Sequence, residues 1–383
     1  MINTEKRQKV LATSWHPGGA NTIVPVIKKL IEENKVDVVV IGHQYSEKIF
    51  QSKGIDYKTI AHWGLKDVSL DSMIRLLQLE SPNLVLTGTS AQDPNNKDVI
   101  EQTIALAAQK MGINSLAVLD NWLNYSLRFG DVSGAKKFKF LPTKIAIMDQ
   151  IAEQSMLNEG FAKEKLVITG NPHFDDLTIK AKAFSRAKKS AVRQKIGLRT
   201  ESLIFFAADS WKNEYAEQGF WDLTIIDLII DVLESLPEKQ KKIIGLAVKL
   251  HPRTPADDRD EIKKYVEKNS GKKIKLIENI DTQEVVLASD LILITNSTVG
   301  IETVYMSKPC ISLQPGLKGE DLLIVSKHGV VPVGYTDKDC KEEVKKAILN
   351  KKHRKEMIKR ASSFKTDGKA TQRVTELVYQ MLG

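Results

Sequence analysis

Two stretches in the second half of the chain, residues 243–253 (IIGLAVKLHPR) and 291–302 (LILITNSTVGIE), predict its fold. Each begins with an apolar run typical of a buried strand in a parallel sheet, and each ends in polar residues. Ligands of open α/β sheets bind beyond the carboxyl ends of the strands, so we expect both polar segments to face one crevice. The cations, imidazole, hydroxyl groups and helix start gathered there suit a phosphate group, and Glu302 suits a sugar hydroxyl.

The composition is that of a globular protein. The chain has 383 residues, of which 42% are hydrophobic and 27% charged, so it is long enough for two packed domains. Its two cysteines, Cys310 and Cys340, exclude a disulfide framework and a multi-cysteine zinc site, and they fit a reducing compartment. Residues 1–9 are polar, and no apolar stretch approaches the roughly 20 residues that span a bilayer. We therefore expect neither an export signal nor a transmembrane helix. The expected location is the cytoplasm, either in solution or peripherally at the inner face of the membrane.

The net charge of +9 favours a polyanionic or anionic-membrane partner. Much of the excess lies in an acid-free stretch from Lys180 to Lys195. This stretch is either a solvated helix face or a peripheral contact with an anionic membrane. Its basic residues do not alternate with aromatic ones as in nucleic-acid-binding segments, so we expect no nucleic-acid partner. A homodimer is compatible with the sequence.

Apolar runs alternate with amphipathic segments along most of the chain, as in βαβ units. The runs of the first half are residues 10–14, 36–42, 84–88, 115–120, 144–148 and 166–169. Those of the second half are residues 203–208, 243–248, 274–277, 291–295, 310–313 and 330–333. A break falls near Pro172, because the residue before a proline is disfavoured in the α region.

This pattern predicts an α/β protein with two Rossmann-like, doubly wound parallel-sheet domains that face a cleft. We expect an acceptor domain at residues 1–172, a basic interdomain linker at 173–200 and a nucleotide-donor domain at 201–383. The last helix is amphipathic, and one possibility is that it packs back onto the first domain.

Several candidate phosphate-binding residues follow strands of the second half. Lys249, His251 and Arg253 would share one face if the extended conformation continued past the strand. Ser210 follows the first strand of this half, where its hydroxyl group could bond a phosphate. These residue types at neighbouring strand ends predict an anion site.

The second polar segment would act through a helix start. Ser297 or Thr298 can cap the helix and leave its first N–H groups aimed at a phosphate. Gly300 has no side chain and would let the backbone approach the ligand closely. Glu302 would accept hydrogen bonds from ribose hydroxyls, or it would only complement the helix dipole. No H-E-x-x-H segment or histidine cluster occurs, so we expect neither a metal nor a bound cofactor.

The loop at residues 14–21 (SWHPGGAN) follows the first strand of the chain and precedes a helix. Its paired glycines, Gly18 and Gly19, let backbone N–H groups approach a ligand, and Asn21 adds a polar side chain; a plain strand-to-helix turn is the alternative. His16 is a candidate for acceptor binding or for the catalytic base.

A second polar group follows the strand predicted at residues 115–120. Asp120 is the leading candidate for a general base, with helix capping as its alternative role. Asn121 and Arg128 are candidates for binding an acidic acceptor, although Arg128 suits a surface salt bridge equally well. Trp122 and Tyr125 could stack on a sugar ring, but their spacing favours packing.

With these residues in place, the chain resembles the GT-B superfamily of nucleotide-sugar enzymes over nearly its whole length. The motifs that carry the resemblance are Gly18-Gly19, residues 169–175 (TGNPHFD), residues 249–253 (KLHPR), Ser297-Thr298 with Glu302, and residues 367–370 (DGKA). The His-Pro and Ser-Thr pairs are similar to motifs of bacterial sialyltransferases, capsule Kdo transferases and CDP-glycerol transferases, which use cytidine nucleotides. In such families these residues hold the donor phosphate, which implies that role for His251, Ser297 and Thr298.

The segment at residues 169–175 is also similar to that of the non-hydrolysing UDP-N-acetylglucosamine 2-epimerases. Their His-Val-Glu-Ala-Gly-Leu-Arg segment is absent, and residues 117–122 (AVLDNW) stand in its place. The acidic base motif of the sialyltransferases is absent as well, so neither resemblance assigns the base.

Our leading hypothesis is a metal-independent glycosyltransferase. It would move a sugar from a nucleotide-sugar donor to a glycan or lipid-linked acceptor of surface polysaccharide synthesis. A CMP- or CDP-linked donor is favoured over a UDP-linked one. Asp120 or His16 would deprotonate the acceptor, and His251 with the Ser297-Thr298 turn would stabilise the departing phosphate. The alternative is a UDP-N-acetylhexosamine 2-epimerase or hydrolase of the same fold, which needs no acceptor. A third reading is a protein that binds sugar nucleotides without turnover.

Overall fold

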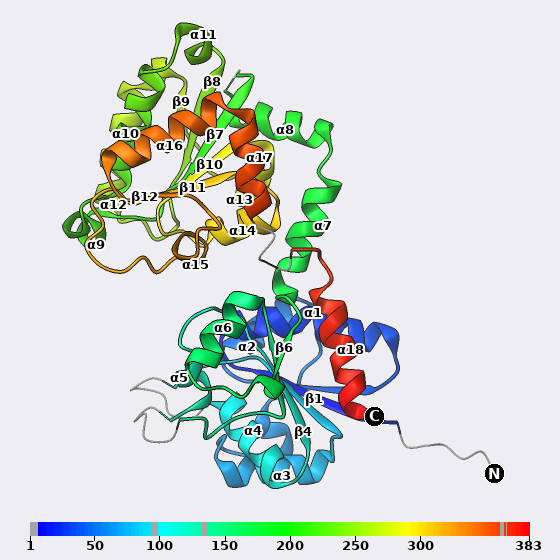
Figure 1. Cartoon of the computed structure of the whole chain (residues 1–383). Coiled ribbons are helices and arrows are strands. Elements are labelled where there is room, and N and C mark those ends of the chain that lie inside the picture. Colours follow the sequence, from blue (N-terminus) through cyan, green and yellow to red (C-terminus); the bar gives the residue numbers. More distant parts are fainter. Residues whose placement is uncertain (1–6, 93–98, 132–136, 199, 361–363, 365) are drawn as a thin grey trace. The chain divides into compact units, whose positions relative to one another are not determined.

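Two six-stranded parallel sheets form the centres of two units in the computed structural model (Figure 1). The structure describes residues 7–92, 99–131, 137–198, 200–360, 364 and 366–383. Unit 1 comprises Met1–Asp175 and Ser363–Gly383, and unit 2 comprises Asp176–Ser362. This architecture confirms the predicted fold class of two Rossmann-like, doubly wound α/β units.

The first sheet has the strand order β2-β1-β3-β4-β5-β6. Its strands are β1 (Lys9–Ser14), β2 (Asp37–Gly42), β3 (Leu84–Thr87), β4 (Asn114–Val118), β5 (Lys144–Ile147) and β6 (Leu166–Ile168). They are short apolar runs, and the central ones are buried on both faces because helices cover both sides. The sheet grows in opposite directions from β1 and β3, so the gap between these two strands is its topological switch point.

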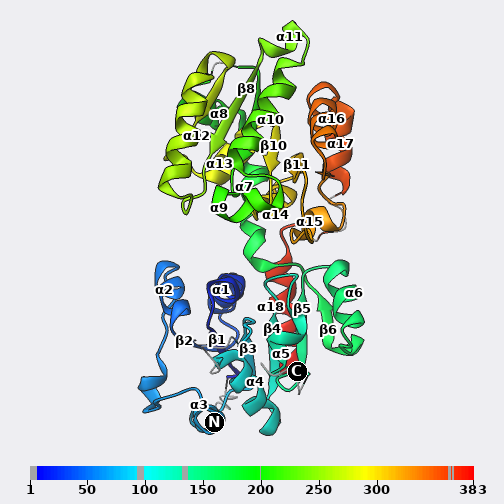
Figure 2. The same ribbon diagram turned by 90° about the vertical axis from the view of Figure 1, so that its left-hand side faces the viewer.

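Helices cover both faces of the first sheet (Figure 2). α1 (Pro17–Glu33) and α18 (Ala370–Leu382) pack on one apolar face, and α3 (Leu70–Glu80) and α4 (Ile100–Lys110) pack on the other. The remaining helices of this unit are α2 (Tyr45–Ser52), α5 (Tyr125–Phe129), α6 (Gln150–Asn158) and the 3-10 turns η1 (Ile60–Trp63), η2 (Lys163–Lys165) and η3 (Pro172–Phe174).

The second sheet has the order β12-β11-β10-β7-β8-β9, with its switch point between β7 and β10. Its strands are β7 (Ser202–Ala207), β8 (Ile244–Lys249), β9 (Ile274–Leu276), β10 (Leu291–Ile294), β11 (Cys310–Leu313) and β12 (Val333–Gly334). The run predicted at 330–333 yields only the two-residue edge strand β12, because Pro332 has no N–H to give to the sheet.

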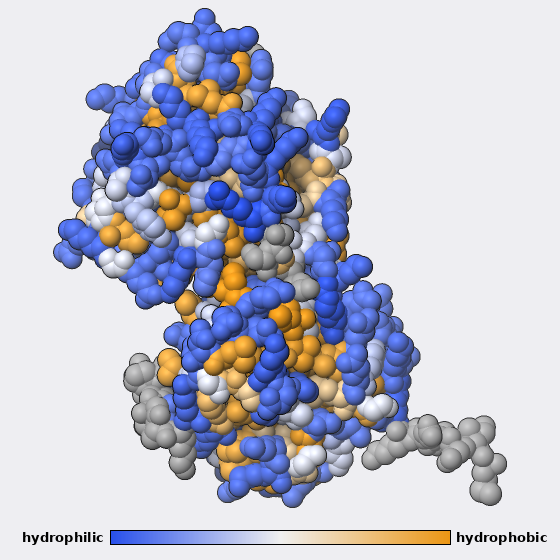
Figure 3. Space-filling model, viewed as in Figure 1, coloured by the Kyte–Doolittle hydropathy of each residue, from blue (hydrophilic) through white to orange (hydrophobic). Residues whose placement is uncertain are grey.

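The helices of unit 2 enclose this second sheet. They are α8 (Arg186–Ile196), α9 (Lys212–Tyr215), α10 (Asp222–Glu234), α11 (Glu238–Lys241), α12 (Ala256–Lys268), α13 (Thr282–Ala288), α14 (Val299–Tyr305), α15 (Ile324–Lys327), α16 (Asp337–Leu349), α17 (Lys351–Arg360), and the 3-10 turns η4 (Ala216–Gln218) and η5 (Ser270–Lys272). An apolar core lies between the sheet and α10, α12 and α16. Hydrophilic residues cover most of the face seen in Figure 3.

The basic stretch predicted as a linker contains two helices, α7 (Asp175–Ala183) and α8. α8 packs on α13, and Lys189 and Arg193 of α8 each form an ion pair with Asp290, at 2.8 and 2.6 Å. These two cations therefore have a structural partner within unit 2, while a membrane contact of the stretch stays a prediction. No described helix is long and apolar enough to cross a membrane.

The carboxylate of Asp175 joins two distant parts of unit 1. It accepts hydrogen bonds from the backbone N–H groups of Ala370 at 3.1 Å and Thr371 at 2.7 Å, at the start of α18. Burial raises the pKa of Asp175, and these two hydrogen bonds oppose that rise. Arg373 of α18 also donates to the backbone oxygen of Thr169, at 2.8 Å. The last helix is thereby fixed to the unit that the chain left nearly 200 residues earlier.

We expect Asp175→Ala to loosen the start of α18, because two N–H groups lose their acceptor. A lost helix cap of this kind costs about 1–2 kcal/mol. Hydrogen exchange at the amides of Ala370 and Thr371 should accelerate accordingly. Asp176→Ala, which removes the exposed neighbouring carboxylate, is the matched control and should leave both amides protected. Equal acceleration in the two variants would show that the cap does not hold the helix.

Candidate functional site

The floor of the candidate site in unit 2 lies at the switch point between β7 and β10. Ser210, after β7, donates from Oγ to Thr295 Oγ1 at 2.5 Å. Ser312 of β11 donates in turn to the backbone oxygen of Thr295 at 2.6 Å. All three side chains are fully buried. Ser210 thus ties the two central strand ends together, which differs from the phosphate contact expected of it.

His251 and Asp209 lie above this floor. His251 follows β8, and its Nδ1 accepts a hydrogen bond from the backbone N–H of Arg253 at 3.1 Å. This bond assigns the proton of a neutral ring to Nε2, which lies 4.0 Å from Asp209 Oδ1. Burial raises the pKa of Asp209, while the nearby His251 and Arg253 and a hydrogen bond with Ser297 oppose the rise. The structure therefore brings His251, Arg253 and Ser297 of the prediction together around one carboxyl group.

Aromatic contacts hold the side chains of Arg253 and His251. The guanidinium of Arg253 lies 5.6 Å from the centroid of the Trp211 ring, and the ring of His251 lies 5.9 Å from the same indole. Trp211 is half-buried after β7. An imidazole N–H and a guanidinium fixed in this way are suitable donors for a phosphate group.

The turn before α14 supplies hydroxyl groups to the same place. Ser297 is buried, and its Oγ accepts a hydrogen bond from the N–H of Val299 at 3.4 Å. Thr298 is exposed at the N-cap position of α14. A Cβ atom on Gly300 would lie 2.5 Å from Ile294 Cδ1. Gly300 therefore lets α14 pack closely on β10, and its contact with a ligand stays a prediction.

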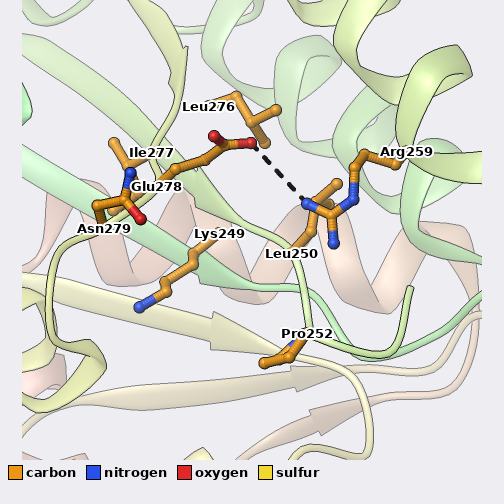
Figure 4. Close-up of a pocket in the computed structure, with 8 residues that line it drawn as sticks. All are labelled: Lys249, Leu250, Pro252, Arg259, Leu276, Ile277, Glu278 and Asn279. Atoms are coloured by element: carbon orange, nitrogen blue, oxygen red, sulfur yellow. Dashed lines mark ion pairs between the residues drawn. The ribbon is translucent and has the colours of Figure 1, made fainter. Parts of the chain in front are cut away.

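Lys249 lies beside a neighbouring pocket of about 290 Å³ (Figure 4). Its ammonium group donates to the backbone oxygen of Ile280. Arg259 and Glu278 lie on the other side, with Nη1 and Oε1 3.9 Å apart. Lining the pocket are Lys249, Leu250, Pro252, Arg259, Leu276, Ile277, Glu278 and Asn279. The pocket adjoins the His251 loop, since Arg259 also donates to the backbone oxygen of His251 at 3.3 Å.

Glu302 has partners outside this group. Burial raises the pKa of its carboxyl group, and a hydrogen bond with Gln283 opposes the rise. The side-chain oxygen of Gln283 in turn accepts a hydrogen bond from Lys180, at 2.9 Å. Glu302 is thus bound into a network with α7 and α13, and its contact with a ribose stays a prediction.

Asp222 is a buried carboxylate that sequence reasoning missed. It begins α10, and its Oδ1 accepts the backbone N–H groups of Asp209 at 3.1 Å and Ser210 at 2.9 Å. Oδ2 has no hydrogen-bond partner among the described residues. Burial raises the pKa of Asp222 to about 7, with the nearby Asp209 and Asp258 adding to the rise. Asp222 holds the loop that carries Asp209.

In unit 1, the backbone of α1 touches the end of β3 at the other switch point. A Cβ atom on Gly19 would lie 2.7 Å from Ser14 Oγ and 3.3 Å from the Cα of Gly88. A Cβ atom on Gly88 would lie 2.8 Å from the Cα of Gly19. Both positions therefore require glycine for packing, and ligand access is not what selects it at Gly19.

Asp120, the leading candidate base, is held by three neighbours. Its Oδ1 accepts hydrogen bonds from Arg128 Nη1 at 2.6 Å and from Thr89 Oγ1 at 2.9 Å. A Cβ atom on Gly18 would lie 2.2 Å from its Oδ2, so the carboxylate abuts the first turn of α1. Arg128 was expected to bind an acceptor, but it forms this largely buried ion pair. Asn121 is exposed beside the pair, and Asn21 is half-buried on α1.

The aromatic residues near Asp120 serve packing. Trp122 and Tyr125 are 4% and 3% exposed, which excludes the ring faces that a sugar would need. Trp122 donates from Nε1 to Asp149 at 2.9 Å and stacks on Phe174 at 6.5 Å. His16, by contrast, is half-buried beside Trp15, at a ring-centroid distance of 4.0 Å.

Glu101, in the first turn of α4, is the second carboxylate that the sequence did not reveal. It accepts hydrogen bonds from Trp15 N at 2.8 Å, Ser90 Oγ at 2.8 Å and Ser14 Oγ at 3.1 Å. Burial raises its pKa, and these bonds oppose the rise. In sequence it looks like an acid that complements a helix dipole. The only signal available was its place next to a serine-rich strand end.

Glu101→Ala should destabilise unit 1 by about 3 kcal/mol or more, because three buried donors lose their acceptor. Denaturant unfolding and hydrogen exchange at Trp15 should both report the loss. Glu101→Gln keeps an acceptor oxygen and should cost less. Thr103→Ala is the control on the same helix, since its hydroxyl bonds only to the helix backbone. A Glu101→Ala protein as stable as the Thr103→Ala protein would contradict this role.

Asp222 should make unit 2 less stable as the pH rises. Its pKa is about 7 in the folded protein against an ordinary value of 3.8 for an aspartate, so the folded state binds the proton more tightly. The stabilisation is full below about pH 4 and is lost as the pH rises through 7, a change on the order of 2–4 kcal/mol. Asp222→Asn should flatten this slope in urea unfolding at several pH values, while Asp257→Asn, at an exposed carboxylate, should keep it. An unchanged slope in Asp222→Asn would refute the assignment.

Among the described residues, no group of three or more His, Cys, Asp or Glu side chains could hold a metal ion. The residues at both switch points are instead hydrogen-bonding and acid-base groups. Such groups can bind a phosphate and move protons without a metal.

Comparison with known proteins places this arrangement in a family. No curated protein matches the chain in sequence. The solved UDP-GlcNAc 2-epimerase of Neisseria meningitidis bound to UDP-GlcNAc is similar with a TM-score of 0.70 and 18% identity, over 97% of this chain and 100% of that chain. MnaA of S. aureus, solved with UDP, reaches 0.64 at 18% identity over 98% of both chains. The glycotransferase of kitacinnamycin reaches 0.57 at 11% identity, over 99% of this chain and 100% of that chain. These likenesses show the GT-B-like fold.

A family model provides the finer assignment. The model described as UDP-N-acetylglucosamine 2-epimerase matches residues 143–379, which include all of unit 2 and most of α18. The match corrects the relationship expected from the His-Pro and Ser-Thr pairs, which was to sialyl, Kdo and CDP-glycerol transferases. Because the model covers more than half of the chain, the protein belongs to the UDP-N-acetylglucosamine 2-epimerase family.

Proposed function

We propose that this protein converts a UDP-N-acetylhexosamine by acid-base chemistry on the sugar, as a 2-epimerase, without an acceptor. The observation that carries the proposal is the family match over residues 143–379, which includes the Asp209, His251 and Ser297 cluster. It favours the alternative hypothesis from the sequence over the leading one, since a glycosyltransferase is supported only by fold neighbours such as the kitacinnamycin enzyme.

The nucleotide phosphates would bind in unit 2. The Nε2–H of His251, the guanidinium of Arg253 and the hydroxyls of Ser297 and Thr298 are the donors for them. Asp209 lies in the same cluster, with its Oδ1 4.0 Å from Nε2 of His251. UDP replaces the cytidine nucleotide of our sequence-based expectation, because the structures in the matched family are described with UDP or UDP-GlcNAc.

Inversion at C2 of the sugar requires that the C2–H bond break and that a new C2–H bond form on the opposite face. Because no carbonyl group adjoins C2, the electron pair of the broken bond would form a C1–C2 double bond as the C1–O bond to UDP breaks. Return of UDP to C1, with a solvent-derived proton at C2 on the other face, would restore the sugar nucleotide. Asp120 and Glu101 of unit 1 differ in environment. Asp120 is fixed by the Arg128 ion pair at 2.6 Å, whereas burial raises the pKa of Glu101. Asp120 is the candidate base that would touch the substrate, and Glu101 would position the loop that carries His16.

The test is incubation of the purified protein with UDP-N-acetylglucosamine alone in D₂O, followed by proton NMR. We expect a second UDP-N-acetylhexosamine with inverted C2, and deuterium at C2 in both sugars, because the proton taken from C2 exchanges with solvent. Release of free sugar and UDP would identify a hydrolase. No reaction until a saccharide acceptor is added would overturn the proposal and restore the glycosyltransferase.

Two variants link the reaction to the cluster in unit 2. His251→Ala and Ser297→Ala should each weaken UDP binding about 10-fold, the cost of one charge-assisted hydrogen bond. His328→Ala, an exposed histidine of the same unit, is the matched control and should bind UDP normally. Thermal-shift titration with UDP and CDP measures these affinities and the base preference together. Tighter binding of CDP would contradict the choice of UDP.

A further inference from the structure

Gln44, between β2 and α2, has a backbone conformation that residues other than glycine rarely adopt. Its φ is 53° and its ψ is −113°, outside the allowed regions for an L-residue with a side chain. Such a conformation costs about 1–3 kcal/mol and persists where surrounding contacts enforce it. It lies at the carboxyl edge of the first sheet, where doubly wound folds bind ligands.

Hydrogen bonds from three directions hold this turn. Trp15 Nε1 donates to the side-chain oxygen of Gln44 at 2.8 Å, and Gln44 N donates to Glu47 Oε1 at 3.0 Å. The N–H of His43 donates to Ser46 Oγ, also at 3.0 Å. The turn is therefore fixed to the loop after β1 as well as to its own helix.

The strained turn presents an aromatic side chain to solvent. Tyr45 is 55% exposed, yet its ring stacks on His16 with the centroids 5.7 Å apart and the planes at 11°. His16 in turn lies against Trp15, which is buried. We call Trp15, His16 and Tyr45 the aromatic ledge. It combines rings that are fixed in place with a ring face left open, unlike Trp122 and Tyr125, which are buried in the core.

We propose that the ring of Tyr45, which stacks on His16, packs against the apolar face of a pyranose ring. A sugar ring has one face of C–H groups and a rim of hydroxyls, so it suits an open ring face with polar groups beside it. The exposed Gln44 and the hydroxyl of Tyr45 supply such polar groups. The ring comes either from the sugar nucleotide, in which case the inference rests on the proposed function, or from a free saccharide.

Saturation-transfer NMR and titration with three probes test the ledge: UDP-N-acetylglucosamine, UDP, and N-acetylglucosamine. Tyr45→Ala should weaken binding of a sugar-bearing probe about 3- to 10-fold, the range expected for one lost aromatic contact. Tyr45→Leu keeps apolar area but has no ring face, and should weaken it similarly. Tyr45→Phe should bind normally. Leu79→Ala, at another exposed apolar residue of unit 1, is the control.

The probes separate the two sources of the ring. A Tyr45 effect on UDP-N-acetylglucosamine alone assigns the ledge to the sugar of the nucleotide, and an effect on N-acetylglucosamine assigns it to a separate saccharide. If Tyr45→Ala and Tyr45→Leu bind UDP-N-acetylglucosamine and N-acetylglucosamine as tightly as the unchanged protein does, the inference is overturned. These are binding measurements, so they test the ledge independently of the epimerase activity. If the unchanged protein does not epimerise the sugar but Tyr45→Ala still weakens sugar binding, the proposed function is refuted and the inference about the ledge stands.

Discussion

A parallel strand that is buried on both faces tolerates a polar side chain only where that side chain finds a hydrogen-bond partner, so most of its polar residues follow its end. β10 is four buried apolar residues, and the polar residues Thr295 to Ser297 follow at once. The same constraint acts at β1 in the other unit. Because the two central strands of each sheet end side by side, their polar residues meet at the switch points, as Ser210 and Thr295 do. Packing of the strands therefore selects where chemistry can occur.

The two units solve one problem in the same way. The loop after the first strand of each sheet carries backbone N–H groups that the sheet does not pair. Glu101 accepts the N–H of Trp15 in unit 1, and Asp222 accepts those of Asp209 and Ser210 in unit 2. Each carboxylate begins a helix, is buried, and has one oxygen without a partner among the described residues. A carboxylate held in this way fixes the loop strongly but makes it sensitive to protonation.

Local patterns in the sequence were sufficient for the fold and for part of the site. Strand ends such as residues 249–253 and 296–298 are contiguous, so the sequence shows which polar residues follow which strand. Glu101 and Asp222 could not be found in this way, because each acts on a loop that precedes it by 12 residues or more, and burial gives it that role. Gly19 and Gly300 illustrate a related ambiguity: a glycine needed for close packing looks in sequence like one needed for a ligand.

The motif at residues 169–175 shows why the subfamily was harder to predict than the fold. Asn171 accepts the N–H of His173 at 3.0 Å, and Asp175 caps α18; both contacts are architectural and would serve a transferase as well as an epimerase. The groups proposed to meet the sugar, where these reactions differ, are Asp120 and His16. Both lie outside the matched region 143–379. Their surroundings are formed by contacts such as the hydrogen bond from Thr89 to Asp120, which joins residues 31 positions apart and which no local motif predicts.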